Sequence, residues 1–314
     1  RENYFNERVR SAVHSEIITV RVPELTDPEL KEILGAKGID ATNIKPAVLT
    51  RLRNPRILGI AFDLRDKVEV QNFNELSVER LLFEYIRIGA RDDTEPKSPD
   101  QFSKRLADHA KEIIDRVGRQ QRDDLLIFER IDGQGGHNFG ADLHAASAEH
   151  FFKPLPEDTM LYTIVDDGLS LALGLSIIKS LQKAERAGRD VADALDGLIE
   201  PIAALDKTAD AVFSGIMAAC CDDRCKLEIR RALISSFLCL QNIDPHNYPA
   251  FVAVVRNATD AAVWALFDVS STARYAANKS WLLEAIRECR HKAECWSIIS
   301  EHISTWLCSY SLDP

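Results

Sequence analysis

Apolar residues recur at intervals of three and four along most of the chain, the spacing that places side chains on one face of an α-helix. The clearest examples are residues 77–86 and residues 102–119. Two segments break this pattern. Residues 16–22 (EIITVRV) are rich in β-branched side chains, and residues 160–165 (MLYTIV) are almost wholly apolar, so both are predicted to be strands. The fold class is therefore predicted to be mainly α.

Residues 25–95 are predicted to form several short helices. The first begins after Thr26 or Asp27, whose side chains can cap a helix. Asn54-Pro55 separates the second helix from the third, because proline lacks the amide hydrogen that a continuing helix needs. The polar segment 91–99 (RDDTEPKSP) has no periodicity and is predicted to be the loop that ends this domain.

The order of elements between residues 96 and 166 predicts a winged-helix domain. A long helix is followed by the glycine-rich segment 132–140 (DGQGGHNFG), a short helix at 142–150 and two short apolar strands. A phosphate-binding Walker loop requires a lysine after its glycines, and this segment contains none. We therefore interpret residues 132–140 as a turn.

Almost all of residues 167–314 is predicted to be helical, with short polar connections. Such a long run without strands is typical of stacked helical hairpins, although no strict repeat period is present. We therefore predict an α-solenoid-like array. Its last helix carries an apolar stripe that is predicted to pack on the preceding helix: Trp296, Ile299, Ile303, Trp306 and Leu307.

Composition limits the partners and the compartment. The chain has 314 residues and a net charge of −10, and no apolar run approaches the roughly 18 residues of a membrane span. Nucleic acid is an unexpected partner, because basic residues such as Lys111 and Arg116 share their helix with acids. The seven cysteines are scattered and odd in number, which predicts reduced thiols in the cytoplasm.

The sequence offers no complete active site. Eight histidines are dispersed without metal-ligand spacing, and Cys220, Cys221 and Cys225 lack the paired spacing of a zinc knuckle. Paired acids such as Asp166-Asp167 more often begin a helix than act as acid and base. We predict no catalytic residue and no metal ligand, and the sequence leaves enzymatic activity undecided.

Four segments, taken in order, resemble the STAND class of P-loop NTPases, the relatives of NACHT and NB-ARC proteins. They are most similar to bacterial antiviral (Avs-type) members. These segments are residues 1–5 (RENYF), residues 17–29 with their strand and Thr-Asp-Pro-Glu helix start, residues 52–58 (LRNPRIL) and residues 162–169 (YTIVDDGL). In the last segment, Val165, Asp166 and Asp167 match a Met-His-Asp motif with Asp in place of His.

The resemblance implies three nucleotide-binding residues. Arg1 would sense the terminal phosphate, Pro55 would pack near the adenine, and Asp166 would occupy the place of the histidine that holds the β-phosphate of ADP. A carboxylate there needs a neighbouring cation to face a phosphate. ATP or ADP with Mg²⁺ would bind only together with Walker motifs upstream of Arg1, and this chain alone would hold no cofactor.

The resemblance also implies an order of domains along the chain. Residues 1–24 would end the NTPase core, 25–95 would form a helical lid, 96–166 the winged helix, and 167–314 a helical domain that couples sensor and effector. Its partners would be a protein target or sister protomers, with homo-oligomers forming on activation. The function implied is regulation of a nucleotide switch in anti-phage defence or signalling.

Two other classes of function compete with this interpretation. An α-helical scaffold that never binds nucleotide explains the missing Walker loop equally well. A winged-helix DNA-binding regulator requires basic residues on the helix before the wing, and residues 141–150 contain none. A hydrolytic enzyme ranks last because no catalytic constellation is present.

Overall fold

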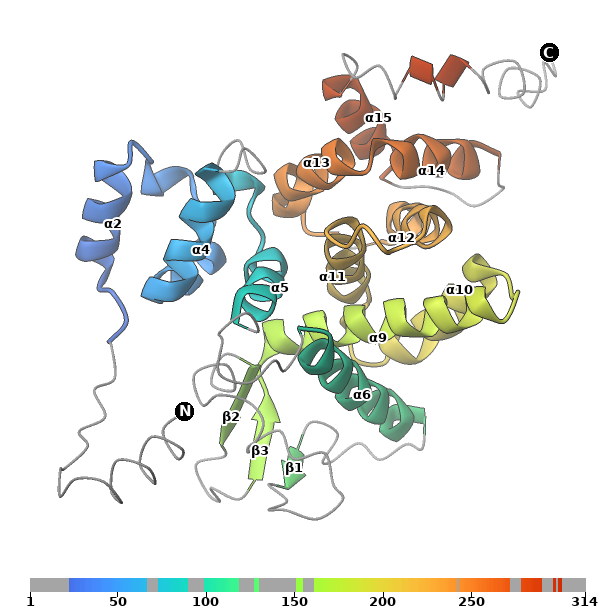
Figure 1. The fold of residues 1–314 in the computed structure, drawn as a ribbon, viewed down its shortest axis with the longest axis horizontal. Helices are drawn as coiled ribbons and strands as arrows, with labels where there is room; N and C mark the ends of the chain where they lie inside the picture. Colours follow the sequence, from blue (N-terminus) through green and yellow to red (C-terminus); the bar gives the residue numbers. More distant parts are fainter. Residues whose placement is uncertain are drawn as a thin grey trace, which may run out of the picture.

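The computed structural model describes residues 23–66, 73–89, 99–118, 127–129, 151–154, 161–241, 243–271, 278–289, 296–297 and 299–300. These residues form twelve α-helices and three short strands, so the predicted mainly α class is confirmed (Figure 1). Arg1, residues 16–22 and the glycine-rich segment 132–140 lie outside the described residues.

Four helices and two 3-10 turns make up the first described part, which lies at one side of the molecule (Figure 1). They are α2 (Asp27–Ala36), η1 (Ala41–Asn43), α3 (Pro46–Leu52), α4 (Pro55–Asp66), η2 (Phe73–Glu75) and α5 (Val78–Gly89). The predicted boundaries are visible in the hydrogen bonds. The Thr26 amide donates to the Glu29 carboxylate at 2.8 Å at the start of α2, and the Asn54 side chain accepts from the amides of Arg56 and Ile57 at the start of α4.

A small antiparallel sheet follows the long helix α6 (Pro99–Gly118). Its strands are β1 (Ile127–Glu129), β2 (Phe152–Pro154) and β3 (Leu161–Ile164). The order in the sheet is β1-β3-β2, with Ile127 opposite Thr163 and Phe152 opposite Ile164. The last strand passes directly into α9 (Asp166–Arg186).

Helix α9 is the central element of the structure (Figure 1). Every residue from Gly168 to Ile177 is buried, as expected for a helix that is covered on all sides by α5, α6 and α11 (Thr208–Cys220). Where α9 crosses α11, a β-carbon added at Gly174 would lie 2.6 Å from the backbone nitrogen of Gly215. Glycine is therefore required at position 174, because the two backbones come closer than any side chain allows.

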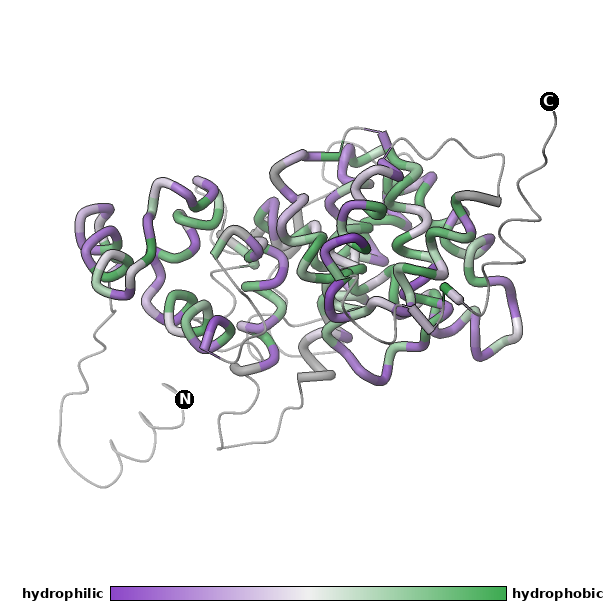
Figure 2. Tube along the Cα trace, turned by 90° about the horizontal axis from the view of Figure 1, so that it is seen from above, coloured by the Kyte–Doolittle hydropathy of each residue, from purple (hydrophilic) through white to green (hydrophobic). Residues whose placement is uncertain are grey.

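The remaining helices stack beyond α9 in two series (Figure 1). The bounds are α10 (Val191–Ala203), α12 (Leu227–Cys239), α13 (Tyr248–Asn257), α14 (Thr259–Ser271) and α15 (Lys279–Glu288), with the 3-10 turn η3 (Pro245–Asn247) before α13. Helices α9, α11, α13 and α15 each contact the next in this series, and so do α10, α12 and α14. Apolar and polar residues alternate along these helices (Figure 2), as in amphipathic helices that share one core.

Aromatic rings fill the core between α11, α12, α13 and α15. The ring of Phe237 lies 5.5 Å from Phe213 and 5.6 Å from Phe251, and Trp281 of α15 lies 6.0 Å from Phe251. The predicted packing of the final apolar stripe is only partly visible. Ile299 contacts the core, Trp296 is 55% exposed, and residues 303–307 lie outside the described part of the chain.

No single helix in the described residues is long and apolar enough to cross a membrane. Helices α13 and α14 pass that test together by length and composition, but they meet at an angle of 111°.

Candidate functional site

The two described residues that the sequence singled out for nucleotide binding occupy helix starts. Pro55 is the first residue of α4, and Asp166 is the first residue of α9. The structure joins the neighbourhoods of these residues, because Arg51 of α3 forms an ion pair with Asp167. Arg51 Nε donates to Asp167 Oδ2 at 3.0 Å, and Nη2 contacts the same oxygen. We call this meeting point of α3, α5, α9 and α11 the charged junction.

Asp166 has its own cation. Lys207, just before α11, donates from Nζ to Asp166 Oδ2 at 2.7 Å and lies 3.7 Å from Asp210. Burial acts to lower the pKa of Lys207, but the hydrogen bond and negative charge of Asp166 outweigh it, so the pKa is raised. Lys207 therefore stays protonated and holds the starts of α9 and α11 together.

A third carboxylate, Glu79, lies in the first turn of α5. Its Oε2 atom is buried and accepts no hydrogen bond. Burial, aided by the like charges of Asp210 and Asp167, raises the pKa of Glu79, while hydrogen bonds to its own amide and to Ser77 act the other way. Sequence reasoning missed this residue, because an acid in the first turn of a helix usually has a helix-capping role.

Lys45, at the start of α3, completes the charged junction. Its Nζ donates to Asn247 Oδ1 of η3 at 3.0 Å. Burial lowers the pKa of Lys45, and the charges of Asp244 and Glu79 partly offset this. The contact links α3 to a residue far along the chain, which no local sequence pattern could have indicated.

Carboxylates outnumber cations at the charged junction. Five acidic and three basic side chains take part: Glu79, Asp166, Asp167, Asp210 and Asp244, with Lys45, Arg51 and Lys207. Burial also raises the pKa of Asp210, although Lys207 partly offsets this. The described charges therefore favour bound protons or added cations, and an anion entering here would need cations from another segment.

A further polar link joins the first helices, at η2, to the helical array, at α13. Arg256 of α13 forms a two-pronged ion pair with Glu75 of η2, with distances of 3.1 and 3.3 Å. The Glu75 side chain is only 5% exposed and that of Arg256 20%. Paired carboxylate and guanidinium groups with this geometry are strong and directional, so this contact fixes the first helices to the array in addition to Arg51–Asp167 and Lys45–Asn247.

Cys220 and Cys225, two of the cysteines that the sequence analysis considered as metal ligands, are free thiols. Burial raises the pKa of Cys225 to about 11 and raises that of Cys220 as well. Both thiols are therefore mainly protonated at neutral pH. In the described residues, no group of three or more His, Cys, Asp or Glu side chains is placed to hold a metal ion.

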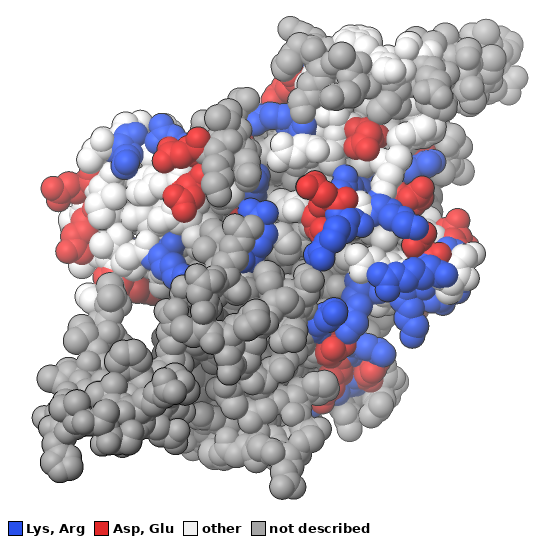
Figure 3. All heavy atoms as spheres, viewed as in Figure 1, with Lys and Arg blue, Asp and Glu red and all other residues white. Residues whose placement is uncertain are grey.

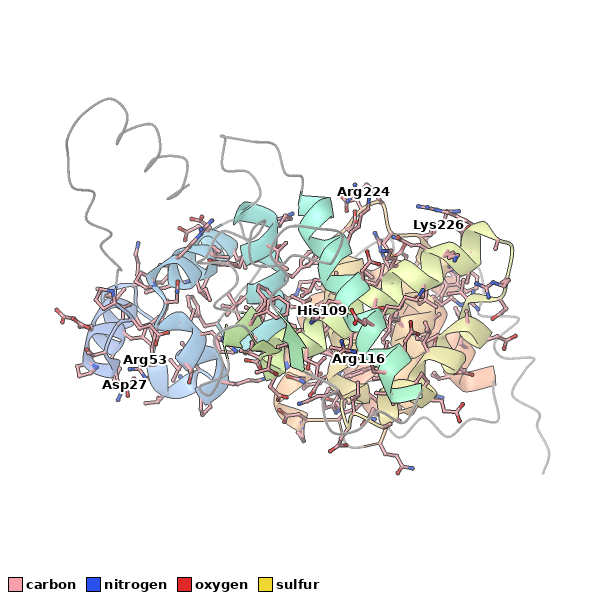
Figure 4. All side chains as sticks on the ribbon, turned by 90° about the horizontal axis from the view of Figure 1, so that it is seen from below. Asp27, Arg53, His109, Arg116, Arg224 and Lys226 are labelled. Carbon is pink, nitrogen blue, oxygen red and sulfur yellow. The ribbon has the colours of Figure 1, made fainter. Side chains whose placement is uncertain are left out.

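On the face shown in Figure 3, described basic residues lie beside acidic ones. Arg224 and Lys226, which lie near each other in Figure 4, are paired with Asp222 and Glu185. At the other side of the molecule, Arg53 lies 3.7 Å from Asp27. This mixture differs from the concentrated positive charge by which proteins bind a phosphate backbone.

Comparisons of the chain with protein-family models, curated proteins and solved structures find no match. The charged junction is therefore interpreted from its own geometry.

Proposed function

We propose that this chain is the regulatory and sensor-linking part of a nucleotide-switched protein of the STAND class, acting in bacterial anti-phage defence or signalling. The observation that carries the proposal is the ion pair between Arg51 and Asp167. It brings the Asn54-Pro55 turn, which would lie near the adenine, toward the acidic turn that would lie near the β-phosphate. The resemblance singled out both of these segments, which lie more than 100 residues apart in the chain.

The Asp166–Lys207 pair supports the proposal because it bears on the carboxylate that stands in the place of the motif histidine. A lone carboxylate at the position of the motif histidine would repel a phosphate. Lys207 neutralises Asp166 at 2.7 Å. The remaining acidic excess of the junction means that a bound nucleotide must bring Mg²⁺ or be met by cations of the NTPase core, for which Arg1 is the candidate in this chain.

Two architectural features are in line with the same proposal. A helix followed by a small antiparallel sheet, with β2 paired to β3, is in line with the order of elements from which a winged helix was predicted. The two series of helices, α9-α11-α13-α15 and α10-α12-α14, resemble the inner and outer layers of an α-solenoid. In this proposal, residues 96–166 form the winged helix and residues 167–314 the sensor-coupling array.

The chain would act as a mechanical part of the switch. The first helices and the array are held together by Arg51–Asp167, Lys45–Asn247 and Glu75–Arg256. ADP would favour this closed arrangement, and ATP with a protein target on the array would favour an open one. A switch of this kind requires that each ligand bind one arrangement more tightly than the other.

The test uses the full-length protein that the gene encodes. Hydrogen exchange in α3 and in the first turn of α9 should be slower with ADP than with a non-hydrolysable ATP analogue. Arg51→Ala should remove most of this difference. Arg186→Ala, which alters an exposed arginine at the far end of α9, is the matched control and should preserve it. Equal exchange with both nucleotides, under conditions where each is bound, would refute the proposal.

The isolated chain should hydrolyse no ATP, because the proposal assigns the phosphate-binding loop to another segment. Turnover that is lost on substitution of a residue within this chain would contradict that assignment.

A helical interaction scaffold without nucleotide is the second candidate, and the two-layered array of α9 to α15 favours it. Nucleotide binding by the full-length protein discriminates the two. The scaffold predicts none, whereas the switch requires a Walker lysine in the segment preceding Arg1.

A further inference from the structure

We propose that the charged junction is a proton-sensitive latch, in which ionisation of Glu79 loosens the contact of α3 and α5 with α9 and α11. This inference concerns the balance of charges in this chain and holds whether or not a nucleotide is involved. Its basis is a carboxylate oxygen, Glu79 Oε2, that is buried and has no hydrogen-bond donor in the structure. Ionisation of a carboxylate is costly when one of its oxygens is buried without a donor, so the charge on Glu79 opposes closure although its own amide and Ser77 donate to the carboxylate.

The groups that face Glu79 compensate that charge only in part, because burial still raises its pKa against the hydrogen bonds from its own amide and Ser77. Asp167 of α9 and Asp210 of α11 repel it, and Lys45 at the start of α3 attracts it. Lys45 Nζ donates a hydrogen bond to Asn247 Oδ1, and Glu79 Oε2 has no donor.

The other cations of the junction have partners of their own. Arg51 is bonded to Asp167, and Lys207 to Asp166.

Helices α4 and α6 also pack on α5, and their charged residues Arg56 and Asp108 contact groups other than Glu79. Arg56 of α4 lies over the Tyr85 ring, 4.9 Å from its centre. Asp108 of α6 pairs with Lys179 of α9. On α5 itself, Glu84 pairs with Arg87. The Glu79 carboxylate is therefore the group whose protonation most directly relieves repulsion between α5 and the two helices α9 and α11.

The direction of the effect follows from linkage. The pKa of Glu79 is raised in the closed structure by burial, so closure binds a proton more tightly than the open state does. Protonated Glu79 stabilises the closed arrangement. This stabilisation is complete below the ordinary carboxyl pKa of 4.5 and is lost as the pH rises through the raised pKa of Glu79. The latch is therefore tight in acid and loosens toward neutral and alkaline pH.

Hydrogen exchange of the chain between pH 5 and pH 8.5 tests this proposal. After correction for intrinsic exchange rates, opening of α5 and the first turn of α9 should increase about tenfold for each unit by which the Glu79 pKa is raised. Glu79→Gln keeps the shape of the side chain and removes its charge. It should reduce the slope of the pH profile and increase protection at pH 8, and the slope that remains is expected from Asp210, whose pKa burial also raises. Glu32→Gln, in an exposed position on α2, should follow the unmodified chain.

Two results would overturn the proposal. One is a flat profile in the unmodified chain, which requires no variant and so does not depend on the folding of Glu79→Gln. The other is a Glu79→Gln profile with the original slope. Asp210→Asn provides a further measurement, since removing one of the repelling charges should reduce the slope without abolishing it, and an unchanged slope would count against the latch.

Discussion

Arg51 in the last turn of α3 is bonded to Asp167 in the first turn of α9, 116 residues further along the chain. The side chains are 22% and 38% exposed, so the pair is partly shielded from water. This contact lies between the turn that contains Pro55 and the start of α9, and it is one of three polar links between the first helices and the array.

Arg51→Ala should lower the free energy of unfolding by about 0.5–1.5 kcal/mol. The expected loss is small because both side chains are partly exposed and water screens their attraction. The loss arises because Asp167 would face Glu79 without its guanidinium partner. Urea unfolding followed by circular dichroism measures it. Arg186→Ala should leave the midpoint unchanged, and an equal effect of both substitutions would remove the special role of Arg51.

Gly174→Ala should destabilise the protein by about 2–4 kcal/mol, because the new methyl group meets backbone atoms that cannot rotate away. The nearest is the Gly215 nitrogen at 2.6 Å. Gly197→Ala is the matched control, since a β-carbon there meets nothing within 4 Å and alanine favours the helix. Thermal unfolding should show opposite shifts for the two variants; a tolerated Gly174→Ala would contradict the close crossing of α9 and α11.

Arg256→Ala should cost about 2–4 kcal/mol, because it removes the guanidinium from a nearly buried carboxylate. Glu75 is 5% exposed and loses both of the contacts made by Arg256. The double variant Glu75→Gln/Arg256→Ala should be less destabilised than the sum of the single variants. A double-mutant cycle by denaturant unfolding measures this coupling, and strict additivity would show that the two residues act separately.

Cys225 should react slowly with Ellman's reagent in the native protein. Burial raises its pKa to about 11, so only about 0.1% of the thiol is ionised at pH 8. Peptide mapping by mass spectrometry after timed labelling distinguishes Cys225 from the other cysteines. Labelling in urea should be faster by more than tenfold; comparable rates in the native and unfolded protein would exclude the buried environment.

The sequence indicates local features of this fold well. Thr26 with Glu29 predicts the start of α2, and Asn54-Pro55 predicts the break before α4, because both depend on residues within one helical turn. The hairpin strands β2 and β3 were predicted from their apolar residues. Strand β1 was not, because its three residues carry no periodic pattern and are positioned by pairing with β3.

The charged junction could be predicted only in part. Asp166 and Pro55 were singled out by resemblance, yet their neighbours Lys207 and Arg51 were not. Glu79 has the appearance of an ordinary acid in the first turn of a helix. What distinguishes it is burial beside α9 and α11, and this arises from tertiary packing rather than from any local pattern.

The close approach of α9 to α11 has a mechanical consequence. Helix α9 resists sliding along its own axis, because its backbone is in close contact with that of α11 near the middle of its length. A displacement of α9 at Asp166 and Asp167 would therefore carry α11 with it, so the two helices are expected to move as one unit.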